Sequence, residues 1–192
     1  PNKYSVLLTP AGGTAAATVA PVTGQLGATV ALRDTIIPGY LQQVNDLATT
    51  ITSQVNSQHK LGFDLTGTGG IDFFDATATD AATFKINPFL TSTNQIAAAS
   101  NALLTGDNSN ALQMAQLQNQ KLMTGNTSTF NSYFDSLVSQ VGLDVSSSKN
   151  TEAQDIAFTR QLTTLRDSNS GVSLDEELTN LIKYQRSYQA SA

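Results

Sequence analysis

Apolar residues recur at helical spacing over most of the chain after residue 24. The longest such run alternates spacings of four and three residues before Gly62, and it consists of Ile37, Leu41, Val44, Ala48, Ile51 and Val55. This a/d pattern predicts a long helix with one apolar seam. A shorter helix is expected over residues 26–36, and Pro38 either ends it or kinks a continuous helix, because proline lacks a backbone N–H.

Two more helical segments are expected in the second half of the chain. Residues 108–123 are rich in Gln and Leu and stop before Gly125, and Thr127 or Ser128 is placed to cap the next helix. That helix has apolar residues spaced four, three and four apart, namely Phe130, Phe134, Leu137 and Val141. Gly142 permits a break or a kink, after which residues 152–167 continue the helical pattern.

Alternation typical of strands is confined to short stretches. Residues 3–9 predict a single strand, and an Ala- and Thr-rich linker follows over residues 11–22. Glycine-rich turns within residues 63–74, together with alternation over residues 83–86, predict short strands or one hairpin.

These patterns together predict a mainly α fold. We expect an elongated antiparallel helical bundle with long heptad-patterned helices and a short β-hairpin or strand element. Residues 1–23 are expected to form a strand and a linker. Residues 24–192 are expected to form a helical rod domain with a small β insertion near residues 63–90.

Composition narrows the possible functions. The chain of 192 residues has a net charge of −5, lacks cysteine and tryptophan, and has no local cluster of basic residues. The acidic balance disfavours binding to nucleic acid or to anionic lipid. The missing cysteines exclude disulfides and cysteine metal sites, and no run approaches the roughly 18 apolar residues of a membrane span. We therefore expect no nucleic-acid partner and no membrane insertion.

His59 is the single histidine and the first candidate for catalysis. No G-x-S-x-G motif accompanies it, and it falls in the last turn of a predicted helix, where a cation is favoured. A solvated structural histidine is therefore the expected role. The G-T-G-G run at residues 67–70 lacks the Lys-Ser or Lys-Thr of a phosphate loop, and the neighbouring oxygen donors lack the spacing of a calcium loop. The sequence predicts no catalytic, cofactor-binding or metal-binding residues, and no enzyme activity.

The last predicted helix carries the candidate assembly residues. Ser173 and Glu176 form a capping box at its start, and the acidic residues 175–177 suit the first turn, where the helix dipole favours anions. One apolar stripe follows along the helix and contains Leu174, Leu178, Leu181, Ile182 and Tyr188. This stripe is expected to pack against neighbouring helices.

The same segment carries a family resemblance. The residues S-G-V-S-L-D-E-E-L, followed by L-I-K-Y-Q-R-S-Y-Q-A-S-A, resemble the C-terminal signature of bacterial flagellar axial proteins. Upstream stretches resemble one group of these, the hook-associated proteins of the hook–filament junction. They are G-Q-L-G-A with L-R-D within residues 24–34, N-S-Q-H-K-L-G-F-D-L-T-G at residues 56–67, and D-F-F at residues 72–74.

This resemblance implies a structural subunit of the bacterial flagellum that packs its terminal helices at the hook–filament junction. The implied partners are other copies of itself in a ring, the hook protein, the second junction protein and an export chaperone. The implied location is outside the cell, after secretion through the flagellar export channel. Family chains extend beyond both ends of this sequence, so the resemblance implies a C-terminal fragment, in which residues 1–23 are the remnant of a preceding β-rich region.

Three other functions stay open at this point. Another flagellar axial protein, of hook, rod or flagellin type, shares the terminal motif. A surface adhesin or sugar-binding module could use the Thr-rich strands, and an enzyme could use His59.

Overall fold

The computed structural model describes residues 7–8, 13, 17–18, 23–104, 106–170 and 174–191, and helices dominate it. The chain divides into two compact units, residues 1–139 and residues 140–192, which are described separately. Because helices dominate the described residues, the expectation of a mainly α fold is confirmed.

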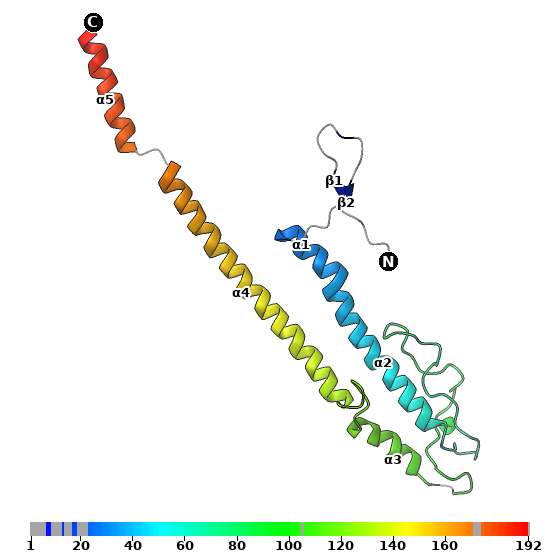
Figure 1. The fold of residues 1–192 in the computed structure, drawn as a ribbon. Helices are drawn as coiled ribbons and strands as arrows, with labels where there is room; N and C mark the ends of the chain where they lie inside the picture. Colours follow the sequence, from blue (N-terminus) through cyan, green and yellow to red (C-terminus); the bar gives the residue numbers. More distant parts are fainter. Residues whose placement is uncertain are drawn as a thin grey trace. The chain divides into compact units, whose positions relative to one another are not determined.

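Two short strands precede the helices. Strand β1 (Leu7–Leu8) pairs antiparallel with β2 (Ala17–Thr18), with Leu7 opposite Thr18 and Leu8 opposite Ala17 (Figure 1). The expected strand over residues 3–9 thus has a partner in the segment that was predicted to be a linker. The remaining residues of that expected strand lie outside the described residues.

A continuous helical segment runs from residue 24 to residue 59. Helix α1 (Gly24–Ala31) passes through a π-helical turn (Leu32–Ile36) into α2 (Ile37–His59). Pro38 closely follows the π-helical turn, so its missing N–H removes one bond from the ladder of a continuous helix. Of the two outcomes expected at this proline, the continuous helix is the one that forms.

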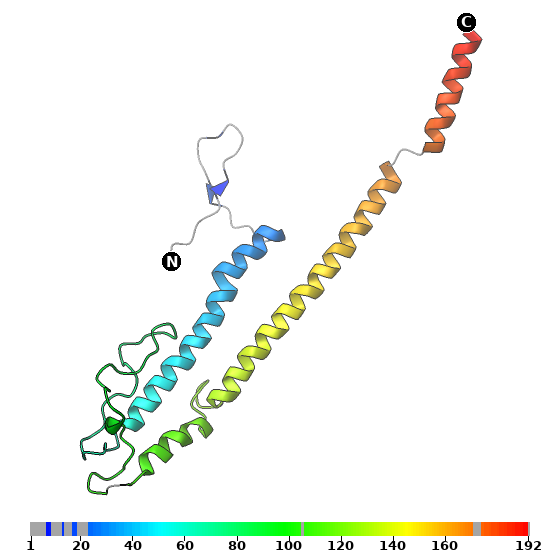
Figure 2. The ribbon, with the colours of Figure 1, turned by 180° about the vertical axis from the view of Figure 1, so that it is seen from behind.

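Residues 61–104, here called the insertion loop, cover the C-terminal part of α2, and both views show the loop lying along that end of the helix (Figures 1 and 2). The predicted β-hairpin near residues 63–90 is not formed. Isolated bridges stand in its place, joining Phe63 to Gly69 and to Ala99, and Phe74 to Ile86. Aspartate side chains in the loop accept hydrogen bonds from nearby backbone N–H groups, which competes with a regular ladder.

Helix α3 (Ser109–Gln116) and a 3₁₀ turn (Leu117–Asn119) return the chain toward α4 (Phe130–Ser170). The cap of α4 is Thr129, whose hydroxyl oxygen accepts the Ser132 N–H at 3.2 Å, and not Thr127 or Ser128 as predicted. Both of those residues belong to the preceding turn, because the N–H of each is bonded to the Met123 carbonyl. Helix α4 continues through Gly142 without a break.

The second unit contains the rest of α4 and the terminal helix α5 (Leu174–Ser191). The predicted capping residue Ser173 lies outside the described residues. Among the described helices, none is both long enough and apolar enough to cross a membrane.

The face of α2 that is most buried is polar. Thr52, Asn56 and His59 are buried, whereas Ile37 and Leu41 of the apolar seam are exposed, Leu41 to 57%. The insertion loop brings backbone N–H and C=O groups to the helix, and these groups need polar partners when they are shielded from water. The N-terminal half of the apolar seam is therefore left outside the core of this unit.

Candidate assembly surface and the clamp on the insertion loop

His59 joins two distant parts of the insertion loop. Its Nδ1 donates a hydrogen bond to the Ile71 carbonyl oxygen at 2.6 Å, and its Nε2 accepts the Ala97 N–H at 2.9 Å. The side chain is 0% exposed, and its ring meets the Phe73 ring edge-on at a centroid distance of 5.4 Å. The prediction of a solvated histidine is wrong, because the sequence does not reveal that the loop folds back over the end of α2. Both ring nitrogens are bonded to backbone groups, which fits a structural role.

Asn56 binds the loop one turn before His59. Its Nδ2 donates to the Phe74 carbonyl oxygen at 2.9 Å, and its Oδ1 accepts the Phe74 N–H at 2.8 Å. The side chain thus satisfies both backbone groups of one residue, as a neighbouring β-strand would. Nearer the N-terminus of α2, Asn45 accepts the Ala81 N–H through Oδ1 at 2.9 Å.

Helix α3 holds the same loop from its own side through Asn110. The side chain of Asn110 is buried, donates through Nδ2 to the Ala97 carbonyl oxygen at 2.6 Å, and accepts from Gln58 Nε2 at 2.7 Å. Ala97 is therefore fixed on both sides, with its N–H on His59 and its C=O on Asn110. We call the set Asn56, His59 and Asn110 the clamp.

Two glycines allow the close approach that the clamp requires. A Cβ at Gly70 would overlap the His59 carbonyl group and lie 2.7 Å from the Ala97 Cβ. A Cβ at Gly62 would lie 2.6 Å from the Ala97 carbonyl oxygen and would overlap the Asn110 amide. These are positions where the backbone of the loop contacts the helices directly.

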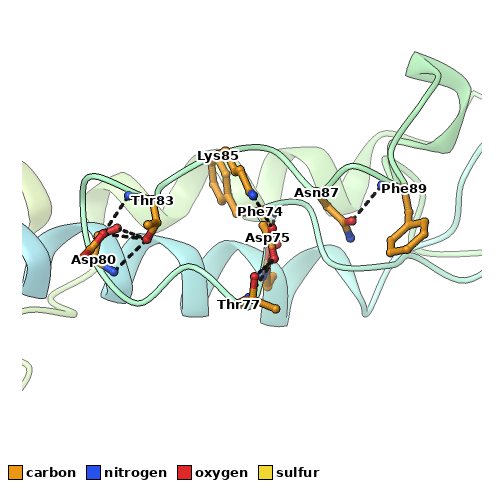
Figure 3. Close-up of polar contacts among 9 residues, drawn as sticks. Phe74, Asp75, Thr77, Asp80, Thr83, Lys85, Asn87 and Phe89 are labelled. Atoms are coloured by element: carbon orange, nitrogen blue, oxygen red, sulfur yellow. Dashed lines mark hydrogen bonds and ion pairs between the residues drawn. The ribbon is translucent and has the colours of Figure 1, made fainter.

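The exposed side of the loop is built from aspartate turns (Figure 3). Asp75 accepts the N–H and the hydroxyl of Thr77, and Asp80 makes the same pair of bonds with Thr83. Lys85 lies 3.2 Å from the Asp75 carboxylate and ties the two sides of this part of the loop together. Such turns hold a polar loop in shape without a strand ladder.

Hydrogen bonds from Thr and Ser hydroxyls lower the pKa of four aspartate carboxyl groups in or next to the insertion loop. The pKa of Asp64, Asp75, Asp80 and Asp107 is lowered, first of all by hydrogen bonds from the hydroxyls of Thr66, Thr77, Thr83 and Ser109 respectively. A carboxyl group with a lowered pKa in the folded state stabilises the fold fully above its unfolded pKa of about 3.9. That contribution is lost as the pH falls through the folded value.

We therefore expect the free energy of unfolding to fall as the pH drops below about 4, measured by urea titration at closely spaced pH values. Asp75→Asn should make this loss smaller, because the amide oxygen keeps the turn but does not titrate. Asp135→Asn, a matched change at an exposed position on α4, should leave the loss unchanged. Equal acid sensitivity in wild type and Asp75→Asn would contradict this account.

An open cleft of about 440 Å³ lies on the insertion loop, with Phe63, Leu65, Ile96 and Leu104 in its lining. Its two carboxylates, Asp64 and Asp107, accept hydrogen bonds from Thr68 and Ser100 N–H groups of the loop itself. The described residues contain no group of three or more acidic, histidine or cysteine side chains that could hold a metal ion.

The predicted assembly residues lie along α5 and are exposed. Leu178 is 54% exposed and Tyr188 is 77% exposed, and Leu181 and Ile182 are also open to solvent. The side chain of Leu174 lies outside the described residues. Helix α4 has the same character, with exposed apolar residues at Val141, Leu143, Val145, Ile156, Phe158, Leu162 and Leu165.

The start of α4 differs from the rest of that helix because it packs within the first unit. Leu137 is buried, and burial, followed by the negative charge of Asp46 on α2, raises the pKa of Tyr133. Beyond this packed start, exposed apolar side chains continue along α4.

Two protein-family models match parts of the chain. Residues 1–74 match the family model described as the flagellar hook-associated protein FlgK helical domain. Residues 166–192 match the model described as the flagellar basal body rod FlgEFG protein C-terminal region.

Among curated proteins, the chain is 36% identical over 157 residues to flagellar hook-associated protein 1 of Salmonella typhimurium, covering 75% of this chain and 28% of that protein. The protein of the same name from Escherichia coli is 33% identical over 159 residues, covering 78% and 29%. That from Bacillus subtilis is 27% identical over 172 residues, covering 82% and 33%. Over about three quarters of its length, the chain is therefore similar to flagellar hook-associated protein 1. It spans about a third or less of the length of these relatives.

Part of the clamp lies within the residues that carry the similarity to hook-associated protein 1. The stretch at residues 56–67, which carries part of the resemblance in the sequence, contains Asn56, His59 and Gly62 and so supplies two clamp residues and one close-contact glycine. The family is a structural one, which confirms the expectation that the chain is not an enzyme.

Sequence reasoning missed the polar face of α2. Asn45, Thr52, Asn56 and His59 are spaced seven, four and three residues apart, the same heptad spacing as the apolar seam. This polar stripe is visible in the sequence, but a solvent-facing stripe has the same helical period, so the pattern alone does not identify a face that binds backbone groups.

Proposed function

We propose that this chain is part of a structural subunit of the hook–filament junction of the bacterial flagellum. The observation that carries the proposal is the pairing of a family match with long helices whose apolar side chains are exposed. A helix gains most of its stability from packing an apolar face against other elements. Helices α4 and α5 therefore suit a protein that is completed by assembly.

On this proposal, assembly occurs through helix–helix packing in an elongated antiparallel bundle with heptad-like seams. Residues 24–192 act as one helical rod domain with its insertion near residues 63–90, and residues 1–23 belong to a preceding part. In α5 the packing residues are Leu174, Leu178, Leu181, Ile182 and Tyr188. Burying the exposed parts of Leu178, Leu181 and Ile182 would contribute about 2.5–5 kcal/mol before ordering costs.

The proposed partners are other copies of the protein in a ring, the hook protein and the second junction protein, with an export chaperone before secretion. The proposed location is outside the cell, reached through the flagellar export channel. Support comes from the names of the relatives, which are hook-associated proteins.

A second candidate is a rod or hook subunit of the flagellum. The match of residues 166–192 to a rod-protein C-terminal model favours it for the terminal segment. The match of residues 1–74 to the hook-associated helical domain favours the junction for the chain as a whole.

Immunogold labelling of flagellated cells with an antibody against this chain distinguishes the junction subunit from the rod or hook subunit. We expect label at the joint between hook and filament. Label along the hook, or in the rod of purified basal bodies, would support the second candidate and reject the first.

Substitution within the α5 stripe tests the packing residues. We expect Leu178→Asp, placed in the chromosomal gene of the source bacterium, to reduce the number of hooks that carry a filament at least tenfold, because burying an unpaired carboxylate at a helix interface costs several kcal/mol. Asn180→Asp adds the same charge on the opposite side of α5 and should leave filaments intact. Electron microscopy of cells, with immunoblots for protein level, supplies the count, and equal filament numbers in both variants would show that the stripe does not pack.

A further inference from the structure

The cleft on the insertion loop combines an apolar lining with two carboxylates. Phe63, Leu65 and Leu104 belong to the apolar part, and the two leucines are exposed. Asp64 and Asp107 line the same cleft and are partly exposed. Lysine and arginine side chains match both parts, because they lay their methylene groups on apolar surface and keep a charged head at its edge.

Both carboxylates of the cleft are ionised. Hydrogen bonds from the hydroxyls of Thr66 and Ser109 hold the pKa of Asp64 and of Asp107 below its ordinary value, so each group is negative at neutral pH. The ion pairs within the described residues use other aspartates, namely Asp34, Asp72, Asp75 and Asp167. The two negative charges of the cleft are therefore not neutralised by a lysine or arginine of the described chain.

Helix α5 carries a surface of the opposite charge. A shallow groove along one side of it is lined by residues that include Ile182, Lys183 and Arg186. The two cations lie one turn apart on the helix and are exposed. The ion pairs of the described residues involve other cations, namely Arg33, Lys60, Lys85 and Arg166. No acidic residue follows Glu177 in the sequence, so this end of α5 is basic.

The charges of these two surfaces favour a head-to-tail contact between copies. A symmetric contact through the cleft would place four carboxylates together, and like charges across an interface are unfavourable. A contact between the acidic cleft of one copy and the basic helix of another leaves one free surface of each kind. Such a contact can repeat, and it closes into a ring when the rotation between copies allows it.

We propose that the insertion-loop cleft of one copy binds α5 of a second copy. Lys183 and Arg186 pair with the two carboxylates of the cleft, and Ile182 lies against its apolar lining. This contact rests on the proposed assembly of the chain with other copies of itself, and it assigns the two surfaces that meet.

Sedimentation velocity of the whole chain at increasing concentration tests the contact, with two variants that each remove one surface. Leu65→Lys with Asn108→Lys adds two cations at exposed positions of the cleft and keeps the aspartate turns. Lys183→Glu with Arg186→Glu reverses the charge of α5. We expect wild type to form complexes larger than a dimer, and each variant alone to have a dissociation constant about tenfold higher or more, because like charges then face one another.

Mixing the two variants identifies the contact. Each variant keeps the surface that the other lacks, so the mixture should associate as tightly as wild type but stop at a one-to-one complex. Lys149→Glu with Arg160→Glu makes the same charge change on α4 and should behave like wild type. A wild type that stays monomeric at about 1 mM, a mixture that does not associate, or association that both variants retain would overturn the proposal.

Cysteine cross-linking decides the matter if the cleft variant does not fold. The natural chain has no cysteine, so Asn108→Cys and Ala190→Cys place a single thiol on the cleft and on the basic side of α5. A disulfide between these two variants should form about tenfold faster than one between Asn108→Cys and Gln185→Cys, whose thiol lies on another side of α5. Equal rates would overturn the contact.

The contact and the proposed function fail separately. Immunogold label at the joint between hook and filament, without association through the cleft, rejects the contact alone. Association through the cleft, with label elsewhere on the flagellum, supports the contact and rejects the junction as its location.

Discussion

Replacing Gly70 with alanine is expected to lower the free energy of unfolding by about 3 kcal/mol. The new Cβ would overlap the carbonyl group of His59 and would lie 2.7 Å from the Ala97 Cβ. Neither neighbour can move aside cheaply, because the first is helix backbone and the second belongs to a residue fixed by His59 and Asn110. The loop must therefore detach from α2, or the clamp must shift as a whole.

Thermal unfolding followed by circular dichroism measures this effect. For a chain of this size, about 3 kcal/mol corresponds to a fall in Tm of about 6–12 °C. Gly69→Ala is the control, since nothing lies within 4 Å of a Cβ at that adjacent glycine. It should be neutral or slightly stabilising, because alanine restricts the unfolded chain. Similar Tm values for the two variants would mean that the loop does not approach α2 as closely as described.

Replacing Asn56 with alanine is expected to lower the free energy of unfolding by about 2–4 kcal/mol. The change leaves both the N–H and the C=O of Phe74 without their partner at a partly buried position, and each unsatisfied group costs about 1–3 kcal/mol when it is buried. The aromatic contacts of Phe74 with Phe73 and Phe84, at centroid distances of 4.9 and 4.5 Å, would loosen with it.

Urea unfolding measures this loss, with Asn45→Ala as the control on the same helix. Asn45 is half-buried and accepts one hydrogen bond, from the Ala81 N–H, so its removal should cost about 1 kcal/mol. A loss at Asn56 no larger than that at Asn45 would show that the paired bonds to Phe74 do not hold the loop.

The sequence by itself determined where the helices lie. The apolar spacing in α2 and in the first half of α4 marks helices because a period of three to four residues puts those side chains on one face. It also excluded disulfides, since cysteine is absent, and its terminal motif pointed to the flagellar proteins whose C-terminal model matches residues 166–192. These conclusions depend on local spacing and residue type, which a sequence displays directly.

Boundaries and caps were less accessible to sequence reasoning. Thr127, Ser128 and Thr129 can all act as caps, and the choice of Thr129 depends on the turn before it, where Thr124 and Asn126 adopt positive φ angles of 52° and 66°. The hairpin expected in the insertion loop failed for a related reason. Aspartates such as Asp75 and Asp80 take the N–H groups that a ladder would use.

The tertiary structure decided which face of each helix is covered. A periodic pattern shows that α2 has an apolar face and a polar face, but it does not show which of them meets another part of the chain. The polar face is covered because the backbone groups of the insertion loop need partners there, and Asn56, His59 and Asn110 satisfy them across 12 to 38 residues of sequence. Hydrogen bonds over such separations exist only once the chain has folded, so the burial of His59 could not be read from its position at the end of a helix.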